Sequence, residues 1–218
     1  MKYYQLIDGL MQFYAQGEYA KEAIQAKTEF FELAGIFDGQ SNIFEMRMAQ
    51  FSDWYIFSRV MPKFGLTPLE HFMQVRPLKV SEEDMPFYVN LSNHRLSLFE
   101  FLKLKGSDLH VRDLFSNYKL IIKDSPVTVG FTSDEIFQGR LIPHEDSFLF
   151  SPAFCFHPIE ARNFILKEIK SVRKVSDEDQ KAAREKLVLR LFKMRNKFEQ
   201  YSHVGIKEIY SNESRLRV

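Results

Sequence analysis

The segment GRLIPHEDSFLFSPAFCFHPIEAR, residues 139–162, separates two parts of the chain that have different hydrophobic periodicities. It contains the only cysteine, Cys155, between Phe154 and Phe156, and His157 follows. Upstream, apolar and polar residues alternate with the period of two that is typical of strands. Downstream of Pro158 the helical period returns. We therefore interpret this segment as the last hairpin of a small sheet and its connection to C-terminal helices.

Five short strands are predicted before residue 158. The clearest is SLFEFLKLKG (97–106), in which apolar and charged residues alternate as in a half-buried strand. Short polar turns connect the strands, which indicates an antiparallel meander that could curl into a barrel-like sheet. Because proline has no N–H group, Pro152 in the fifth strand is expected at an edge or a bulge. The predicted strands cover residues 96–105, 109–115, 118–124, 136–142 and 147–156.

Helices are predicted on both sides of the sheet. The strongest start signal is TPLE (67–70), with Thr67 as the N-cap, Pro68 at the first helical position and Glu70 three residues after the cap. FDGQSN (37–42) is predicted as a turn, and the last 14 residues as an extended segment with a frayed end. The predicted helices cover residues 2–16, 18–33, 42–61, 67–76 and 81–92, then 158–172 and 176–201.

These patterns predict an α+β fold with an N-terminal helical lobe, a small five-stranded antiparallel sheet and basic C-terminal helices that pack back. No linker-like composition interrupts the chain, so we expect one compact domain over residues 1–218. Its sub-regions are 1–93, 96–157 and 158–218. The 22 phenylalanines among 15% aromatic residues indicate a core packed largely with phenylalanine.

Composition excludes several classes of protein. A single cysteine excludes an intramolecular disulfide framework and a multi-cysteine zinc module. The N-terminal residues lack the apolar run of a signal peptide, and no run approaches the length of a membrane-spanning helix. We therefore expect a cytoplasmic protein without a membrane span. No phosphate-binding glycine motif, GxSxG or HExxH is present, and no cofactor is expected.

Charge is distributed unevenly along the chain. Residues 1–158 contain 15 Lys and Arg against 20 Asp and Glu, whereas residues 159–218 contain 15 against 9. The basic part includes an amphipathic helix, AAREKLVLRLFKMRNKFEQY (182–201). Such asymmetry fits a basic surface for an acidic partner, and it fits equally a tail that packs on the acidic part of its own chain. We favour a helix that docks through its Leu and Phe side chains and exposes a basic outer face.

Several short motifs together resemble an uncharacterised family of bacterial proteins. The resemblance covers residues 20–210, and in some members of that family a similar arrangement precedes a cysteine-rich SEC-C zinc motif. This chain has one cysteine, so that zinc motif is absent. The resemblance implies membership of a bacterial, cytosolic family and implies no activity. The motifs are FSDWYIFSR (51–59), GLTPLEHF (65–72), HRLSLFEF (94–101), VRDLF (111–115), IFQGRLIP (136–143) and FSPAFCFHPIEAR (150–162).

Three small groups of residues are candidate sites. Cys155 and His157 lie two residues apart on one face of a strand, as a thiol–imidazole pair requires, but apolar neighbours favour a buried, unreactive thiol. His144, Glu145, Asp146 and His157 contain metal-binding atoms, although a polar hairpin tip is the favoured interpretation. The only tryptophan, Trp54, could stack on a ligand or peptide. For its neighbours Asp53 and Arg59 we favour the role of ordinary surface charges.

The favoured function is a non-enzymatic cytosolic interaction or regulatory module with a protein partner. One alternative is a nucleic-acid-associated protein that uses the basic C-terminal helix. Another is a small-molecule sensor or enzyme at the sheet near Cys155 and His157. Residues proposed for an interaction surface are Trp54, Arg59, Arg140, His157, Arg184, Arg190, Lys193 and Lys197.

Overall fold

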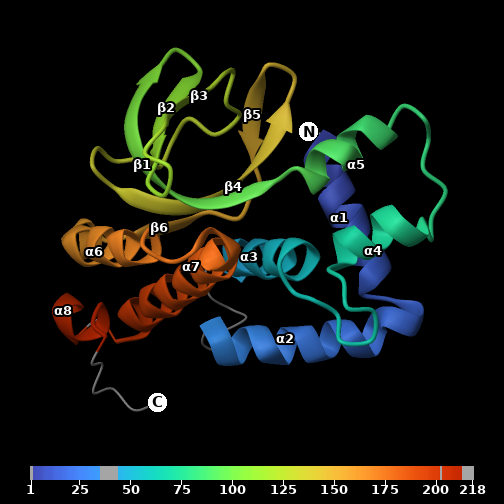
Figure 1. The fold of residues 1–218 in the computed structure, drawn as a ribbon, viewed down its shortest axis with the longest axis horizontal. Coiled ribbons are helices and arrows are strands. Elements are labelled where there is room, and N and C mark those ends of the chain that lie inside the picture. The colour runs from blue at the N-terminus through green and yellow to red at the C-terminus, as the bar shows by residue number, and fades with distance from the viewer. Residues whose placement is uncertain (1, 35–43, 202, 213–218) are drawn as a thin grey trace.

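A curled antiparallel sheet covers one side of a layer of helices in the computed structural model (Figure 1). The structure describes residues 2–34, 44–201 and 203–212. The predicted turn at residues 37–42, the predicted helix start at residue 42 and the last six residues lie outside these ranges. The predicted α+β fold, with helices before and after the sheet, is confirmed.

The N-terminal helices pack around a shared aromatic and aliphatic core that includes Tyr3, Tyr14, Phe51, Tyr55 and Phe72. At Thr67 the predicted capping box is confirmed: the Glu70 N–H donates to Thr67 Oγ1 at 3.2 Å, and the Thr67 N–H donates to a Glu70 carboxylate oxygen at 2.8 Å. The helices of this region are α1 (Lys2–Tyr14), the 3-10 helix η1 (Gly17–Tyr19), α2 (Ala20–Ala34), α3 (Phe44–Phe57), α4 (Pro68–Val75) and α5 (Met85–Ser92).

The sheet has the strand order β3-β2-β1-β4-β5, and every pair is antiparallel. It curls into a half-barrel, and the Ser147 hydroxyl joins its two ends, because it accepts from the Lys123 N–H at 3.0 Å and donates to the Ile121 carbonyl at 3.2 Å. The strands are β1 (Arg95–Lys105), β2 (Asp108–Asp113), β3 (Lys119–Ile122), β4 (Ile136–His144), β5 (Ser147–Phe150) and β6 (Cys155–His157).

Strand β4 is buried from residue 136 to residue 142 because both of its faces are covered. Phe137 and Leu141 face the inside of the curl, where they pack in an aromatic cluster. Ile136 and Ile142 belong to the clusters that the sheet forms with the helices. Since side chains alternate along a strand, Gln138 and Arg140 also point toward the helical layer.

The observed sheet differs from the predicted meander in two ways. β4 pairs with β1 and not with β3, so the strand order is not that of a meander. The expected fifth strand is also two separate strands. β5 pairs with the end of β4 and β6 pairs with its beginning, so both lie along the same edge. Residues 151–154, which include Pro152, separate them, since proline cannot donate to a ladder. Gly139 lies opposite this break, and a Cβ atom there would come within 3.0 Å of the Phe150 ring. Pro152 was expected at a strand edge or a bulge, and instead it lies in a segment that interrupts the strand completely.

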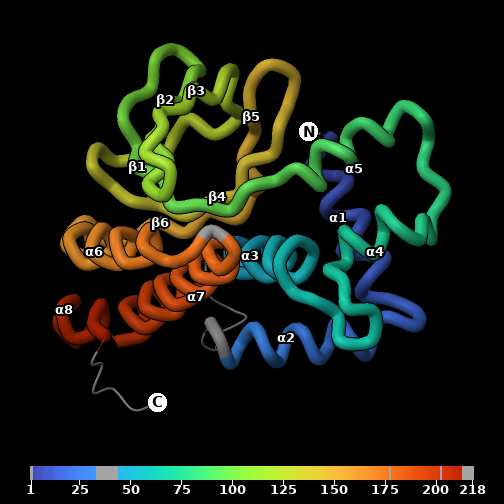
Figure 2. Tube along the Cα trace, in the orientation of Figure 1, coloured from blue at the N-terminus to red at the C-terminus, as the bar shows by residue number. Residues whose placement is uncertain are grey.

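The C-terminal helices pack back against both other regions, as predicted. Helix α7 crosses beneath the sheet and runs beside α2 (Figures 1 and 2). Its Leu191 is packed in the cluster under the sheet, whereas Phe192 contacts Phe30 of α2 with ring centroids 5.6 Å apart. The elements are the 3-10 helix η2 (Ile159–Ala161), α6 (Arg162–Val172), α7 (Asp177–Gln200) and α8 (Ile206–Ile209).

Part of the expected extended tail is helical. Ile206–Ile209 form α8, and Ile209 and Tyr210 are buried against the sheet-side cluster. Four residues have too little local propensity to form a stable helix alone, so tertiary packing overrides the local sequence pattern here. Within the described ranges, none of the helices combines the length and apolarity needed to cross a membrane.

Candidate functional site

Arg140 forms the centre of a buried polar cluster between β4 and α3. Its side chain is 1% exposed. The guanidinium donates through Nε to Asp53 Oδ1 at 2.8 Å, through Nη2 to Ser58 Oγ at 2.9 Å, and it lies 2.9 Å from His94 Nδ1. Asp53 also accepts from the Ser151 hydroxyl at 2.8 Å. The cluster therefore links α3, the start of β1 and the residue after β5.

Burial and positive charge keep His94 neutral. Burial, and next to it the charges of Arg140 and Lys181, lower the pKa of His94 to about 2. A neutral imidazole whose Nδ1 accepts from Arg140 is the form that fits this contact. The Arg140 guanidinium also lies over the Phe57 ring at 4.7 Å from its centroid. Arg140 is thus held on several sides before any ligand is present.

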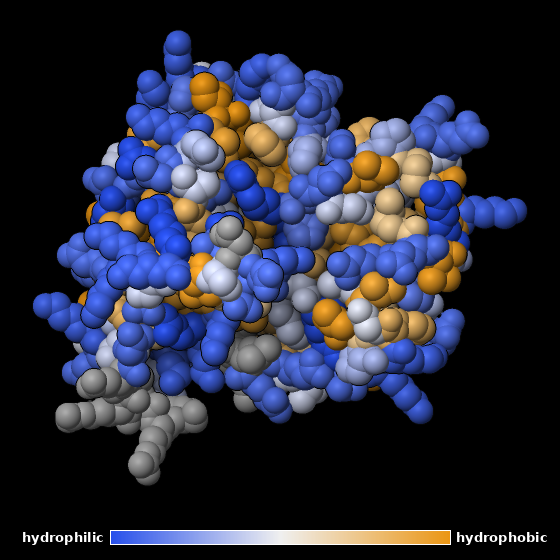
Figure 3. Space-filling model, in the orientation of Figure 1, coloured by the Kyte–Doolittle hydropathy of each residue, from blue (hydrophilic) through white to orange (hydrophobic). Residues whose placement is uncertain are grey.

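A cavity of about 80 Å³ opens beside this cluster, between α3, α7 and the sheet. Three aromatic residues, Phe30, Trp54 and Phe192, form much of its apolar wall. The surface is hollowed near the centre of the view in Figure 3, between the sheet and the helices. The remaining lining residues are Gln50, Asp53, Ser58, Leu96, Gln138, Arg140, Ala153, Glu185, Val188 and Leu189.

The cavity contains a polar atom that the protein leaves unsatisfied. Gln138 is 8% exposed, and its Oε1 has no hydrogen-bond partner among the described residues. A buried acceptor without a donor costs about 1–3 kcal/mol. Gln50, a second buried glutamine on the same cavity, has its amide engaged by Arg47 and the Phe154 carbonyl. Gln138 is therefore available to a donor on a ligand.

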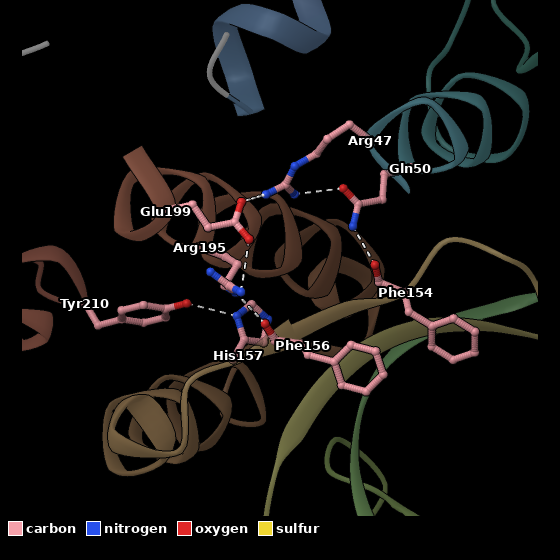
Figure 4. Close-up of polar contacts among 8 residues, drawn as sticks. All are labelled: Arg47, Gln50, Phe154, Phe156, His157, Arg195, Glu199 and Tyr210. Atoms are coloured by element: carbon pink, nitrogen blue, oxygen red, sulfur yellow. Dashed lines mark hydrogen bonds and ion pairs between the residues drawn. The ribbon is translucent and has the colours of Figure 1, made fainter. Parts of the chain in front are cut away.

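His157 belongs to a different buried network, which is shown in Figure 4, and Cys155 lies two residues before it on β6. His157 Nδ1 lies 3.1 Å from the Tyr210 hydroxyl. Arg195 Nε donates to the Phe156 carbonyl at 2.7 Å and its guanidinium pairs with Glu199 at 3.0 Å. Glu199 in turn pairs with the buried Arg47 of α3. These contacts connect α7 and α8 to β6 and α3.

Burial disfavours ionisation of both Cys155 and His157. It raises the pKa of the Cys155 thiol to about 12, against the opposing charges of Arg47 and Arg195. It lowers the pKa of His157 to about 3, and Arg195 adds to this effect. The thiol and the imidazole are therefore both neutral near pH 7. Thiolate chemistry requires the opposite state, so this arrangement favours the structural role.

We expect Cys155 to be unreactive in the folded protein. A buried thiol with a raised pKa is rarely ionised and is out of contact with reagent. Labelling of the native protein with a thiol reagent at pH 8 should proceed only as fast as the structure opens around Cys155. In denaturant, labelling should be complete within seconds to minutes. Rapid, complete labelling of the native protein, at the rate seen in denaturant, would contradict this prediction.

The residues considered as a less favoured metal site do not converge. His144, Glu145 and Asp146 lie at the turn between β4 and β5, where Asp146 pairs with Lys123. His157 lies at the end of β6 and bonds with Tyr210. In the part of the chain that the structure describes, no group of three or more His, Cys, Asp or Glu side chains is placed to hold a metal ion.

The structure brings two of the eight candidate interaction residues together, because Trp54 and Arg140 line the same cavity. Arg184 borders an adjoining groove that also includes Arg140. Arg59 is 5% exposed and pairs with Glu22 and Glu29 of α2. The interpretation of Asp53 and Arg59 as surface charges is wrong, since both are buried in ion pairs between elements.

The remaining candidates on α7 are separate from the cavity. Arg190 pairs with Glu168 of α6. Lys193 Nζ donates to the Glu32 carbonyl at 3.4 Å. Burial, together with the charge of Lys193, lowers the pKa of Lys197. The eight residues therefore do not form one continuous surface.

Sequence reasoning missed Gln138, His94 and Glu185 as site residues. A signal for the first exists: IFQGRLI (136–142) contains two polar residues at alternate positions in an otherwise apolar strand. Two polar residues at alternate positions lie on the same face of a strand, and they indicate that this face does not pack against apolar side chains alone. No comparable signal exists for Glu185, which is one of many charged residues on its helix.

Comparison with protein families gives one match. A family of unknown function, DUF7986, matches residues 2–202, and the chain belongs to this family. A search of curated proteins gives no match, and neither does a search of solved structures.

Proposed function

We propose that the protein is a non-catalytic regulatory module that binds a small molecule in the cavity between α3, α7 and the sheet. An apolar pocket with a few convergent polar groups is the usual form of a small-molecule site. Here aromatic side chains supply the wall, and Gln138 and Arg140 supply polar groups at the sheet. Asp53 and Arg140 are paired with each other, which suits fixed recognition better than proton transfer.

One observation carries this proposal: Gln138 Oε1 has no hydrogen-bond partner among the described residues. Asp53 and Ser58 on the same cavity, in contrast, are both hydrogen-bonded to Arg140. A leucine of similar size would remove the cost of burying that oxygen. If residue 138 served only for packing, the folded protein would therefore be more stable with leucine at this position. Gln138 makes better sense as an acceptor for a ligand donor than as part of the core.

The variant Gln138→Leu tests this function with hexanol, a neutral probe whose hydroxyl group can donate a hydrogen bond. Its thermal midpoint should equal or exceed that of the wild type without ligand, whereas Gln50→Leu, which loses contacts to Arg47 and Phe154, should be clearly less stable. Hexanol should raise the wild-type midpoint in a dose-dependent way by binding the folded state. In Gln138→Leu the increase in thermal midpoint should be reduced severalfold, because the hydroxyl group of hexanol loses its hydrogen-bond acceptor.

Two outcomes would overturn the proposal. A large loss of stability in Gln138→Leu would assign the glutamine a structural role. An equal response to hexanol in the wild type and in Gln138→Leu would show that binding, where present, does not involve this cavity face.

Other expectations stay predictions. A protein partner and a cytoplasmic location are compatible with the proposed module. The relation to regions that precede SEC-C zinc motifs is likewise proposed on the resemblance of short motifs. Nucleic-acid binding by α7 is less favoured, because Arg190 and Arg195 are engaged with Glu168 and Glu199.

A further inference from the structure

A second recess adjoins the cavity on the side of the first turns of α7. Its volume is about 410 Å³. It shares Leu96, Arg140 and Glu185 with the cavity, so these residues form a common border. We call it the basic groove. Its other lining residues are His94, Arg95, Gln180, Lys181 and Arg184.

The basic groove has more positive charge than its own acids neutralise. Arg140 is committed to Asp53, and Arg95 lies 3.3 Å from Asp113. Lys181 and Arg184 have no ion pair among the described residues. Glu185 is the one acid on the lining, so an excess of cationic groups faces the recess.

One guanidinium nitrogen at this groove, Arg184 Nε, is buried and forms no hydrogen bond within the described residues. Arg95 Nη2 is already committed, because it lies 3.3 Å from Asp113 Oδ2. The Arg184 side chain is nevertheless held in place, since it lies over the Phe115 ring at 5.2 Å and donates to Gln180 Oε1 at 2.7 Å. Held arginines with free donors suit carboxylate and phosphate oxygens.

We infer that the ligand is an organic anion whose carboxylate or phosphate group lies in the basic groove near Lys181 and Arg184, while its apolar part enters the cavity beside Trp54. This inference rests on the proposed function and specifies the ligand class for the same site. Only the end of an unbranched alkyl chain enters the cavity, because its volume of about 80 Å³ is smaller than the ~150 Å³ that admits benzene. The rest of such a chain lies at the border and in the basic groove.

Glu185 is placed at the border between the two compartments. Burial raises its pKa, against the lowering effects of Lys181 and Arg140. A carboxyl group with a raised pKa repels an approaching anion less than an ordinary glutamate and, when protonated, donates a hydrogen bond. Protonation of Glu185 when the ligand binds would remove its repulsion of an anion that spans the border.

The test uses calorimetric titration at low ionic strength to compare three probes with six-carbon chains, which are hexanoate, hexyl phosphate and hexanol, with a fourth probe, inorganic phosphate. Hexanoate or hexyl phosphate should bind the wild type at least about tenfold more tightly than hexanol, as expected for one charge-assisted hydrogen bond. Whichever of the two binds more tightly identifies a carboxylate or a phosphate as the natural group. Inorganic phosphate, which lacks the apolar part, should bind more weakly than hexyl phosphate.

The double variant Lys181→Gln/Arg184→Gln separates this inference from the proposed function. It should lose the tenfold preference for the anionic probe and keep the affinity for hexanol. Lys186→Gln, which removes an exposed positive charge from the same helix outside the groove, should leave both affinities unchanged.

Three results would contradict the inference. Equal affinity for hexanol, hexanoate and hexyl phosphate would overturn the anionic class while the proposed function stands. If inorganic phosphate bound as tightly as hexyl phosphate, the basic groove would bind the anion without any contribution from the cavity. Absence of binding by all four probes would overturn the proposed function together with the inference.

Discussion

Replacing Asp53 with asparagine is expected to lower the free energy of unfolding by about 3–5 kcal/mol. Asp53 is the carboxylate partner of Arg140, whose side chain is 1% exposed. Asparagine occupies the same space but leaves the guanidinium charge buried without a counter-charge. Arginine does not deprotonate in proteins, so the charge cannot be relieved by loss of a proton. Urea denaturation followed by circular dichroism measures the change.

Two further variants show that the loss comes from the buried pair. The double variant Asp53→Asn/Arg140→Met should be more stable than Asp53→Asn, because methionine removes the uncompensated charge. Asp146→Asn breaks the exposed pair with Lys123 and should leave the midpoint nearly unchanged. A loss below ~1 kcal/mol for Asp53→Asn would show that water or local movement solvates Arg140, and would contradict the buried arrangement.

Lowering the pH from 7 to 5 is expected to reduce the free energy of unfolding by roughly 4 kcal/mol through His94 and His157. Burial lowers their pKa values to about 2 and about 3 in the folded protein, whereas an unfolded histidine titrates near ~6.5. Below that value the unfolded state binds more protons than the folded state. The stabilisation from neutral histidines is thus complete above the unfolded pKa and is lost as the pH falls. Each group contributes about 2 kcal/mol over this interval.

His157→Asn provides the matched test of this pH dependence. Asparagine keeps a polar group near the Tyr210 hydroxyl but cannot take up a proton, so the decrease between pH 7 and pH 5 should be about half that of the wild type. His203→Gln changes an exposed histidine and should leave the decrease unaltered. A wild-type free energy of unfolding that is constant over this interval would contradict the lowered pKa values of both groups.

Most of the fold follows from local patterns in the sequence. The capping box at Thr67 is confirmed because it depends only on residues within one turn. The alternation along β1 and the helical period along α7 likewise identify those elements. The sequence did not predict the break between β5 and β6 or the helix α8. Both depend on the path of distant segments: the break follows the edge of β4, and α8 is held by the burial of Ile209 and Tyr210.

The site could be predicted only in part. Trp54 and Arg140 were singled out separately, for their residue types, and the structure places both on one cavity. Their connection passes through Asp53, which is 87 positions away from Arg140 in the chain, and local periodicity gives no information on such a pairing. The same limit explains why the sequence pattern predicts exposed positions for Asp53 and Arg59, whereas the structure buries both. A charged residue on a helix is usually exposed, and only the tertiary partner reveals the exception.

The single indole group offers the most direct measurement of the central claim, that the cavity beside Trp54 and Arg140 binds a small organic molecule. Trp54 is the only tryptophan, so its indole N–H gives one resolved signal in a ¹H–¹⁵N correlation spectrum. Titration with hexanoate should shift that signal saturably in the wild type, and the shift should require a markedly higher hexanoate concentration in Lys181→Gln/Arg184→Gln. An indole signal that stays in place at saturating hexanoate would contradict the claim.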